Sequence, residues 1–418
     1  MSQKSELVPK RRFKEFENAE DWEQRKLDDI ADVTKLAGFE FTKYVTYQES
    51  GSIIALRGLN VKNGNIILDD VKYIDKSDFS KLNRSKLFEN DILLTYVGTV
   101  GQVAVVTEND KYYLAPNVAR IRVSDKINPF FVSQMMNAEK FYKRIIFPLI
   151  ATSSQPALSM ENVRKFILVL PKKTEQEKIA LFFNQIDDTI TLHKRKLDKL
   201  KNLKQSYLYQ MFPQNGQKIP TLRFSGFSGD WGVHKLKDMA SLMNGYAFKS
   251  ENYVSNGIYK ILTISNVTGQ RYTDMNETHS VDYLPSNIQS YQILQQGDVL
   301  ISLTGNVGRV SIVNEENCLL NQRVGLLKIN SNVNQEYIYQ CLNNKKFEEK
   351  MIKSGQGAAQ LNISKNDIEE YEILLPSKKE QQKIGKYFKQ LDETIEVQEQ
   401  ELEKLKNLKE AYLNEMFV

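Results

Sequence analysis

Two stretches of the chain repeat apolar residues in alternating steps of four and three. The repeated positions are Ile179, Phe183, Ile186, Ile190, Leu197 and Leu200 in the first stretch, and Ile384, Phe388, Leu391, Ile395, Leu402 and Leu405 in the second. A heptad pattern kept over about four heptads is typical of a coiled-coil helix. We therefore predict two long helices, at 171–213 and 376–418, that pair through these residues.

A helix of about 40 residues would be about 60 Å long, which is too long to pack along one domain of ordinary size, so we disfavour the alternative of two core helices. The series is continued by Leu203 in the first stretch and Leu408 in the second, and it is interrupted by His193 and Gln398. These two polar residues either fix the register of the pair or are solvated interruptions.

The two stretches are near copies of one another. Pro171-Lys-Lys-Thr-Glu-Gln-Glu-Lys-Ile179 returns as Pro376-Ser-Lys-Lys-Glu-Gln-Gln-Lys-Ile384, and 199–204 is identical to 404–409. The segments before them match more weakly but in the same order. We therefore predict a tandem repeat of one globular domain and one long helix, because self-similarity at a fixed offset is typical of duplicated units.

This repeat sets the domain boundaries that we expect. They are an N-terminal extension (1–21), a first globular domain (22–170), a first long helix (171–213), a linker (214–227), a second globular domain (228–375) and a second long helix (376–418).

Each globular domain is predicted to be built from short strands with few helices. The expected strands are 53–57, 92–96, 103–106 and 118–123 in the first domain, and 259–263, 299–303, 310–313 and 324–329 in the second. Helical periodicity is confined to 131–144 and 337–352, which is too little for repeated strand-helix-strand units, so an α+β fold is favoured. Gly98 with Gly101, and Gly305 with Gly308, lie between strands and are interpreted as hairpin turns.

Composition adds the broad class of the protein. The chain has 418 residues, a net charge of +5 and two cysteines, Cys318 and Cys341. No apolar run is long enough to span a membrane, no apolar segment follows Met1 as in a signal peptide, and two cysteines cannot form a disulfide framework. We expect a cytoplasmic protein with no membrane partner. The first helix is rich in lysine and the second in glutamate, which favours antiparallel pairing.

Motifs for catalysis are absent from the sequence. The three histidines form no metal-binding motif, and no phosphate-binding loop occurs. Asn128-Pro129-Phe130-Phe131 partly resembles the Asn-Pro-Pro-Tyr/Phe motif of adenine methyltransferases, but the second proline and a preceding glycine-rich loop are missing, so Pro129 is interpreted as the first residue of a helix. We expect no catalytic residue and no metal site in this chain.

Polar and basic residues in the predicted loops are the candidates for binding. Arg, Lys, Asn and Gln read base edges, and hydroxyls and lysines hold phosphates. As a set on a duplicated scaffold without catalytic motifs they favour DNA contact, although any one of them alone could be solvated surface. They are Lys43, Arg57, Arg84, Tyr96, Thr99, Gln102, Asn117 and Arg120 in the first half, and Lys249, Asn266, Arg271, Thr304, Asn306, Arg309, Asn321, Gln322 and Arg323 in the second.

Together these motifs resemble the specificity subunit of Type I restriction-modification enzymes. The resemblance rests on Pro-x-x-x-Glu-Gln-x-x-Ile followed by Asp-x-x-Ile in both long helices, on the opening Leu-Arg-Phe-x-x-Phe-x-x-x-Trp at 222–231, and on the Asn/Gly-Asp-x-Leu stretches at 90–93 and 297–300. It covers nearly the whole chain. Asn90 departs from the usual glycine, and the first opening is lengthened between Phe16 and Trp22.

The resemblance implies two target recognition domains, each binding one half of a bipartite, asymmetric DNA site. It implies that the helices set the spacer between the halves and dock two modification subunits, which use S-adenosylmethionine to methylate adenine at N6. Restriction subunits would add ATP- and Mg²⁺-dependent translocation and cleavage, so no cofactor is expected on this chain. The alternatives are a duplicated coiled-coil adaptor that does not touch DNA and, much less favoured, a stand-alone methyltransferase or nuclease.

Overall fold

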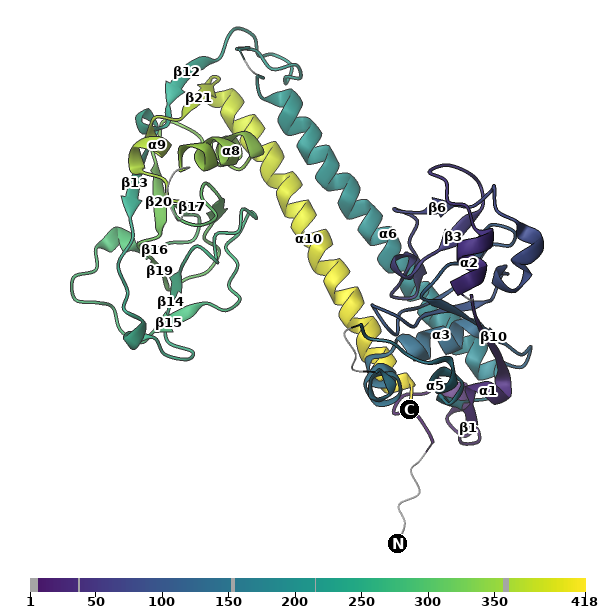
Figure 1. Ribbon diagram of the computed structural model, residues 1–418. Helices are drawn as coiled ribbons and strands as arrows, with labels where there is room; N and C mark the ends of the chain where they lie inside the picture. Colours follow the sequence, from purple (N-terminus) through teal and green to yellow (C-terminus); the bar gives the residue numbers. More distant parts are fainter. Residues whose placement is uncertain (1–6, 37, 152–154, 215, 356–360) are drawn as a thin grey trace. The chain divides into compact units, whose positions relative to one another are not determined.

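The computed structural model describes residues 7–36, 38–151, 155–214, 216–355 and 361–418, and the chain forms two compact units. The first unit comprises Met1–Lys194 with Gln400–Val418, and the second comprises Arg195–Glu399. Residues 1–6 of the expected N-terminal extension lie outside the described residues. Each unit contains one globular part and portions of both long helices (Figure 1).

The first unit has an antiparallel four-stranded sheet as its centre. The sheet order is β2 (Ala31–Lys35), β10 (Val118–Val123), β7 (Ile92–Thr95) and β8 (Val103–Val105), and a second sheet has the order β6 (Lys72–Tyr73), β3 (Ile54–Leu56) and β9 (Tyr112–Leu114). The pairs β1 (Glu23–Lys26) with β11 (Ile167–Leu170), and β4 (Val61–Lys62) with β5 (Asn65–Ile66), complete the strands. The short helices are α1 (Leu27–Ile30), α2 (Gly38–Tyr44), α3 (Pro129–Asn137), α4 (Glu139–Phe141) and α5 (Met160–Arg164).

The second unit repeats this plan in the same order along the chain. Its central sheet is β13 (Ala240–Asn244), β20 (Val324–Ile329), β17 (Val299–Ser302) and β18 (Val310–Ile312), and its second sheet is β15 (His279–Val281), β14 (Tyr259–Leu262), β19 (Cys318–Leu320) and β16 (Ile293–Leu294). The remaining elements are β12 (Gly232–Lys235) paired with β21 (Glu372–Leu375), and helices α7 (Gln335–Leu342), α8 (Lys345–Ser354) and α9 (Lys365–Glu369). The predicted α+β fold with two repeated domains is confirmed.

Each unit buries one tryptophan beside a helix that follows the central sheet. Trp22 packs edge-on against Phe131 of α3, with ring centroids 5.8 Å apart, and Trp231 packs against Tyr337 of α7 at 6.0 Å. Pro129 is the first residue of α3, as predicted, and Asn128 caps that helix by accepting a hydrogen bond from the Phe131 amide. Burial of large aromatic side chains supplies much of the hydrophobic stabilisation of each core.

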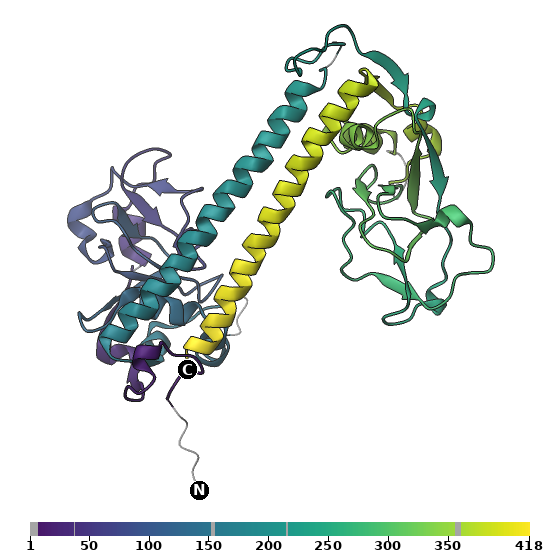
Figure 2. The same cartoon turned by 180° about the vertical axis from the view of Figure 1, so that it is seen from behind.

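The long helices are α6 (Lys173–Met211) and α10 (Lys378–Met416), and they lie antiparallel within each unit (Figure 2). In the first unit Phe182 of α6 packs against Tyr412 of α10 at 5.1 Å between ring centroids, and in the second unit Tyr207 of α6 packs against Tyr387 of α10 at 5.5 Å. The partner's number falls as the residue number rises, which is the order of an antiparallel pair. The predicted antiparallel pairing is therefore confirmed.

The predicted pairing residues are all buried or half-buried, but the seam departs from the prediction near the helix ends. Leu203 and Leu408, which continue the apolar series, are 40% and 45% exposed. The next residues turn inward instead: Lys204 Nζ lies 2.7 Å from Asp392 Oδ1, and Lys409 Nζ lies 2.6 Å from Asp187 Oδ1. A strict heptad count places the leucine on the seam, whereas the straight helix brings the long lysine stem there.

The two polar residues within the seam differ from one another. Gln398 is buried, so it is not a solvated interruption, whereas His193 is half-buried and its Nδ1 lies 3.6 Å from Glu401 Oε2. Among the described residues, no helix is long and apolar enough to cross a membrane.

Candidate nucleic-acid interface

At the start of each long helix, the glutamate of the Glu-Gln pair bonds to the segment that precedes the globular domain, and the glutamine bonds to the domain itself. The Arg12 guanidinium donates two hydrogen bonds of 2.7 Å to the buried Glu175 carboxylate, and Arg223 donates bonds of 2.7 and 2.8 Å to Glu380. The hydrogen bonds raise the pKa of both arginines. Two-pronged arginine-carboxylate pairs are strong and directional. This part of the repeated motif is therefore structural.

The following glutamines close the same junction. The Gln176 amide donates to the Pro171 carbonyl at 2.8 Å and accepts from the Asn128 amide at 2.9 Å. Gln381 makes the same two contacts in the second unit, donating to the Pro376 carbonyl at 2.9 Å and accepting from the Asn334 amide at 3.0 Å. Because both ends of each amide are used inside the protein, these residues account for the near-identity of the helix starts without any ligand.

The Asn/Gly-Asp-x-Leu stretches form the turns that enter β7 and β17, the second strand of each central sheet in chain order. Asn90 and Gly297 have φ of 74° and 97°, the left-handed region that asparagine and glycine tolerate best. The substitution of asparagine for the usual glycine is thus compatible with the turn. The Asp91 carboxylate then accepts from the Phe88 amide at 2.8 Å and from Arg122 at 2.6 and 2.7 Å.

The glycine-containing loops are the hairpin turns that the sequence predicts. Residues 96–102 connect β7 to β8, and 303–309 connect β17 to β18. The loops are held from inside, because the Thr95 and Ser302 hydroxyls accept from the Gln102 and Arg309 amides at 2.9 and 3.1 Å. The side chains at the tips of these loops are thereby presented on a fixed backbone.

In the first unit the structure gathers three candidate DNA-contacting residues around one pocket of about 380 Å³. The pocket, which we call the first loop pocket, is lined by Phe41, Tyr47, Arg57, Gly58, Leu59, Val97, Thr99, Pro116 and Asn117. Thr99 and Asn117 are exposed, and Asn117 has φ of 73° in the turn before β10. Arg57 donates to the Asp70 carboxylate at 2.7 Å, which orients its guanidinium. Hydroxyl, amide and guanidinium groups around an aromatic-lined hollow are suited to base edges.

The remaining candidates of the first unit differ in how far their side chains are exposed to solvent. Lys43 and Arg84 are exposed, and Tyr96 is half-buried with the Lys35 ammonium 5.3 Å from its ring. Gln102 is half-buried and its amide oxygen accepts from the Asn63 backbone at 3.0 Å. Lys43 and Arg84 are therefore available for contact with a polyanion.

The second unit has a pocket lined in part by the aromatic residues that follow β13 in the chain. This second loop pocket, of about 630 Å³, is lined by Tyr246, Ala247, Phe248, Lys249, Glu251, Asn252, Val254, Val281, Asp282, Tyr283, Leu284 and Pro285. The Gln322 amide donates to the Tyr246 carbonyl at 2.9 Å, which places the turn carrying the exposed Gln322 and Arg323 beside the pocket. Tyr283 is 84% exposed.

Other candidates of the second unit lie on or beside the hairpin loop. Asn306 is exposed, Thr304 is half-buried, and the half-buried Arg309 has its Nε 3.5 Å from Glu348. Lys249 is exposed and lies 3.5 Å from Glu251. Surface pairs of this kind are weak, so a phosphate could compete for either basic side chain.

Four candidates are buried in the structure and serve internal contacts, so base reading by them needs a different conformation. The Asn266 amide accepts from the Thr263 backbone at 2.8 Å and donates to the Asp274 carbonyl at 2.7 Å. Arg120 pairs with Asp32 at 2.5 Å, and Asn321 accepts from the Arg323 amide at 3.1 Å. Arg271 is held by two carboxylates and is described below. We therefore leave these four out of the DNA-contacting set that we propose.

The aromatic residues of both pockets are not among the binding residues predicted from the sequence. Phe41 and Tyr47 form an edge-on pair with centroids 5.3 Å apart, and Tyr246 and Phe248 form one at 4.8 Å. The detectable signal was an aromatic pair spaced by a few residues after the first strand of each central sheet. Residue type alone did not separate these aromatics from core positions.

The opposite charges predicted for the two long helices do meet in the second unit. Lys201 of α6 lies 2.6 Å from Glu399 of α10, and the half-buried Lys204 of α6 pairs with the buried Asp392 of α10. Among the described residues, no group of three or more His, Cys, Asp or Glu is arranged to hold a metal ion. Cys318 and Cys341 are both buried as free thiols, and burial raises the pKa of Cys318 to about 11.

Comparison with known proteins places this arrangement in a family. The profile of the Type I restriction modification DNA specificity domain matches twice, at residues 19–202 and 228–407. A putative type I restriction enzyme MjaX specificity subunit of Methanocaldococcus jannaschii is 23% identical over 94% of this chain and 92% of its own length. The type I restriction enzyme MjaVIII specificity subunit of the same organism is 24% identical over 81% of each chain.

Solved structures share the fold across the whole chain. The S subunit of a Type-I restriction-modification system from M. genitalium has a TM-score of 0.65 at 15% identity and covers 99% of both chains. A chain from a structure that describes complex assembly and conformational transition of the type I R-M system has a TM-score of 0.51 at 17% identity. The match covers 95% of this chain and 97% of that chain.

Proposed function

Because this chain belongs to the family of Type I restriction modification DNA specificity domains, we propose that each of its globular domains reads one half of a bipartite, asymmetric DNA site. The observation that carries the proposal is the contrast between the two units. Their helix junctions use the same Arg-Glu and Gln contacts. Their loop pockets differ in volume and in charged residues, which are Arg57 in the first pocket and Lys249, Glu251 and Asp282 in the second. A shared scaffold with different loops suits two different half-sites.

The second part of the proposal concerns the rest of the complex. The chain itself is non-catalytic, and the long helices set the spacer between half-sites and dock two modification subunits. Those subunits bind S-adenosylmethionine and methylate adenine at N6 after the base has left the stack. Restriction subunits, which use ATP and Mg²⁺, complete the assembly. No cofactor is bound by this chain.

The length of the helices is compatible with a spacer role. A helix of 39 residues, such as α6 or α10, is about 58 Å long at 1.5 Å per residue. Half-sites one turn of B-DNA apart are separated by about 34–36 Å along the duplex. Helices of this length are long enough to hold two recognition domains at that separation.

The experiment that tests the proposal is duplex binding by the purified complex of this chain with its modification subunits. The duplex carries the methylated motif mapped in host DNA, and affinity is measured between about 50 and 200 mM salt. A recognition subunit predicts that log K falls linearly with log salt, by about 0.9 per phosphate contact, and that a scrambled motif binds more weakly. Absent binding, or binding that ignores salt and sequence, would instead favour the duplicated adaptor.

A further inference from the structure

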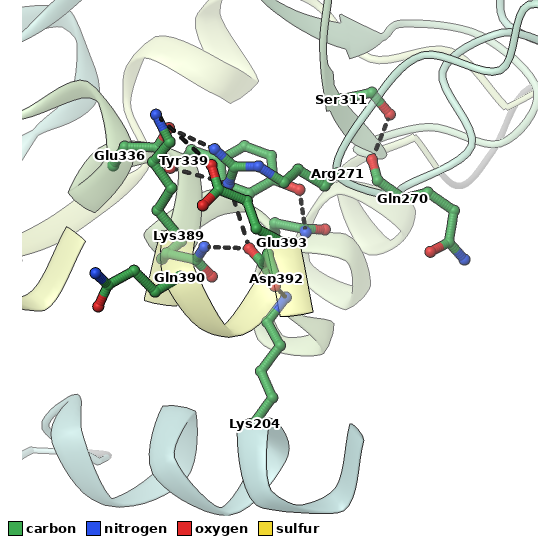
Figure 3. A network of polar contacts seen from close by, with 12 residues as sticks. Lys204, Gln270, Arg271, Ser311, Glu336, Tyr339, Lys389, Gln390, Asp392 and Glu393 are labelled. Atoms are coloured by element: carbon green, nitrogen blue, oxygen red, sulfur yellow. Dashed lines mark hydrogen bonds and ion pairs between the residues drawn. The ribbon is translucent and has the colours of Figure 1, made fainter. Parts of the chain in front are cut away.

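A buried polar network in the second unit joins the globular domain to both long helices (Figure 3). Its centre is the Asp392 carboxylate of α10, which is 5% exposed. It accepts from Lys204 Nζ of α6 at 2.7 Å, from Gln340 Nε2 of α7 at 2.8 Å and from Arg271 Nη1 at 3.3 Å. Three separate segments of the chain therefore converge on one carboxylate.

The first unit contains the same constellation except for the arginine. The Asp187 carboxylate accepts from Lys409 Nζ at 2.6 Å and from Gln134 Nε2 of α3 at 2.8 Å. Residues 64–66 lie beside β8 in the first unit, as Tyr272 lies beside β18 in the second, and they include no basic residue. A cavity of about 380 Å³ opens at this place, and Asp187, Gln134, Phe130 and Ile66 are among its lining residues. The arginine is thus an addition that the shared scaffold does not need.

The Arg271 guanidinium contacts carboxylates and aromatic rings in the second unit. Its two terminal nitrogens lie 3.0 and 2.6 Å from the Glu336 carboxylate of α7. The guanidinium also lies 5.3 Å from the ring of Tyr272 and 5.5 Å from the ring of Tyr339, and the residue is 9% exposed. Planar arginine can make bidentate and stacking contacts at once, which lysine cannot.

The backbone of residues 270 and 271 is hydrogen-bonded to β18 of the recognition domain. The Arg271 carbonyl accepts from the Ile312 amide of β18 at 2.7 Å, and the Gln270 carbonyl accepts from the Ser311 hydroxyl at 2.8 Å. Strand β18 is in turn one side of the hairpin that presents the loop 303–309. The guanidinium therefore connects a helix of the scaffold to the strand that supports a candidate DNA-contacting loop.

A buried ion pair is weak evidence for added stability, because desolvation offsets much of the attraction. Its best-attested use is to select one arrangement among several that are otherwise similar in energy. An arginine that appears in only one of two equivalent junctions, and that bonds to carboxylates on two helices, fits such a selecting role.

We propose that Arg271 is a positioning residue that fixes the second recognition domain on its helices, so that the second half-site is read with stricter geometry than it would be without it. The inference rests on the proposed function. It assigns no direct contact with DNA to Arg271. Loss of the arginine is expected to weaken sequence discrimination in the second half-site and to leave the first half-site unchanged.

The test uses the complex of the full chain with its modification subunits and measures initial rates of adenine methylation. Duplexes carry the mapped motif, or that motif with one base pair changed in either half. For each half-site the readout is the ratio of the cognate rate to the substituted rate. Arg271→Met is compared with Arg223→Met. Arg223 belongs to the same unit and also bonds to a carboxylate through two nitrogens, but it lies far along the chain from the hairpin.

We expect Arg271→Met to lower the discrimination ratio of the second half-site by roughly tenfold, since loss of one well-placed base contact reduces discrimination by about that factor. Arg223→Met is expected to lower the amount of active complex and to leave both ratios unchanged. The double variant Arg271→Met/Glu336→Leu also removes the carboxylate that Arg271→Met leaves without its partner, which makes misfolding less of a concern. It should show the same loss of discrimination in the second half-site.

Unchanged ratios in both Arg271 variants, or an equal loss in Arg223→Met, would overturn the inference. Failure of the proposed function would look different, because the unsubstituted complex would then show no preference for the motif in either half.

Discussion

The ion pair between Arg223 and Glu380 allows the stability of one unit to be perturbed selectively. The two side chains are 14% and 1% exposed and share two hydrogen bonds of 2.7 and 2.8 Å. Glu380→Ala removes the carboxylate and leaves the guanidinium without its counter-ion, bonded to the Gly229 and Ser228 carbonyls alone. Breaking one partner of such a pair costs about 3–5 kcal/mol of unfolding free energy, whereas replacing both partners by apolar residues is often close to neutral.

The two tryptophans provide a separate reporter for each unit. Trp22 is buried in the first unit and Trp231 in the second, and the chain has two tryptophans in all. In a Trp22→Phe background, fluorescence follows the second unit, and in a Trp231→Phe background it follows the first. With a urea m-value of about 3 kcal/mol/M, the expected loss shifts the midpoint of the second unit by about 1–2 M.

The prediction has two controls and a clear refutation. Arg223→Met/Glu380→Leu should recover most of the midpoint, and Glu175→Ala should produce the mirror result, with Trp22 as the sensitive reporter. A shift of the Trp22 midpoint as large as that of Trp231 in Glu380→Ala would refute the reasoning that the pair stabilises its own unit. A shift below about 0.3 M, which corresponds to less than 1 kcal/mol, would show that the pair is no stronger than an exposed one.

Three further predictions concern pH, base reading and spacing. Hydrogen bonds from Lys235 and Lys237 lower the pKa of Glu370 from 4.5 to about 2. The contribution of Glu370 to stability is therefore present above pH 4.5 and is lost as the pH falls toward 2. Glu370→Gln should lower the melting temperature at about pH 6 and not at about pH 2. Asn117→Ala should reduce methylation discrimination in the first half-site and Gln322→Ala in the second, measured on singly substituted duplexes; an equal loss in both halves would contradict base reading there. Insertion of one heptad into both long helices should change the spacer and not the half-sites, as read by sequencing of methylated adenines; altered half-site sequences would refute the spacer role.

Periodicity and repetition were sufficient to predict the scaffold. The heptad series fixed the two helices because burial of one face is a local property of the sequence. The near-identical helix starts predicted a tandem repeat. The structure explains their similarity through Glu175, Gln176, Glu380 and Gln381, whose side chains form hydrogen bonds inside the protein. The same pattern failed at Leu203, where the count of residues cannot show which of two neighbours turns inward.

The interface was predicted less completely, because exposure of a loop residue depends on distant parts of the chain. Asn266 and Arg271 have the residue types of base readers, yet they are satisfied by groups that the sequence does not place nearby. In Arg271 the partner Glu336 is 65 residues away and Asp392 is 121 residues away. Arg57, Thr99 and Asn117, in contrast, line one pocket although they are distant in sequence.

The central claim, that each globular domain reads one half of a DNA site, is tested most directly by duplicating one domain. Residues 228–375 are replaced by a copy of 22–170, the complex with modification subunits is reconstituted, and methylated adenines are mapped by sequencing. The unaltered chain is predicted to give an asymmetric, two-part motif, and the duplicated chain an inverted repeat of the first half alone, because equivalent helices pair antiparallel. A motif that keeps its original second half after the exchange would contradict the account.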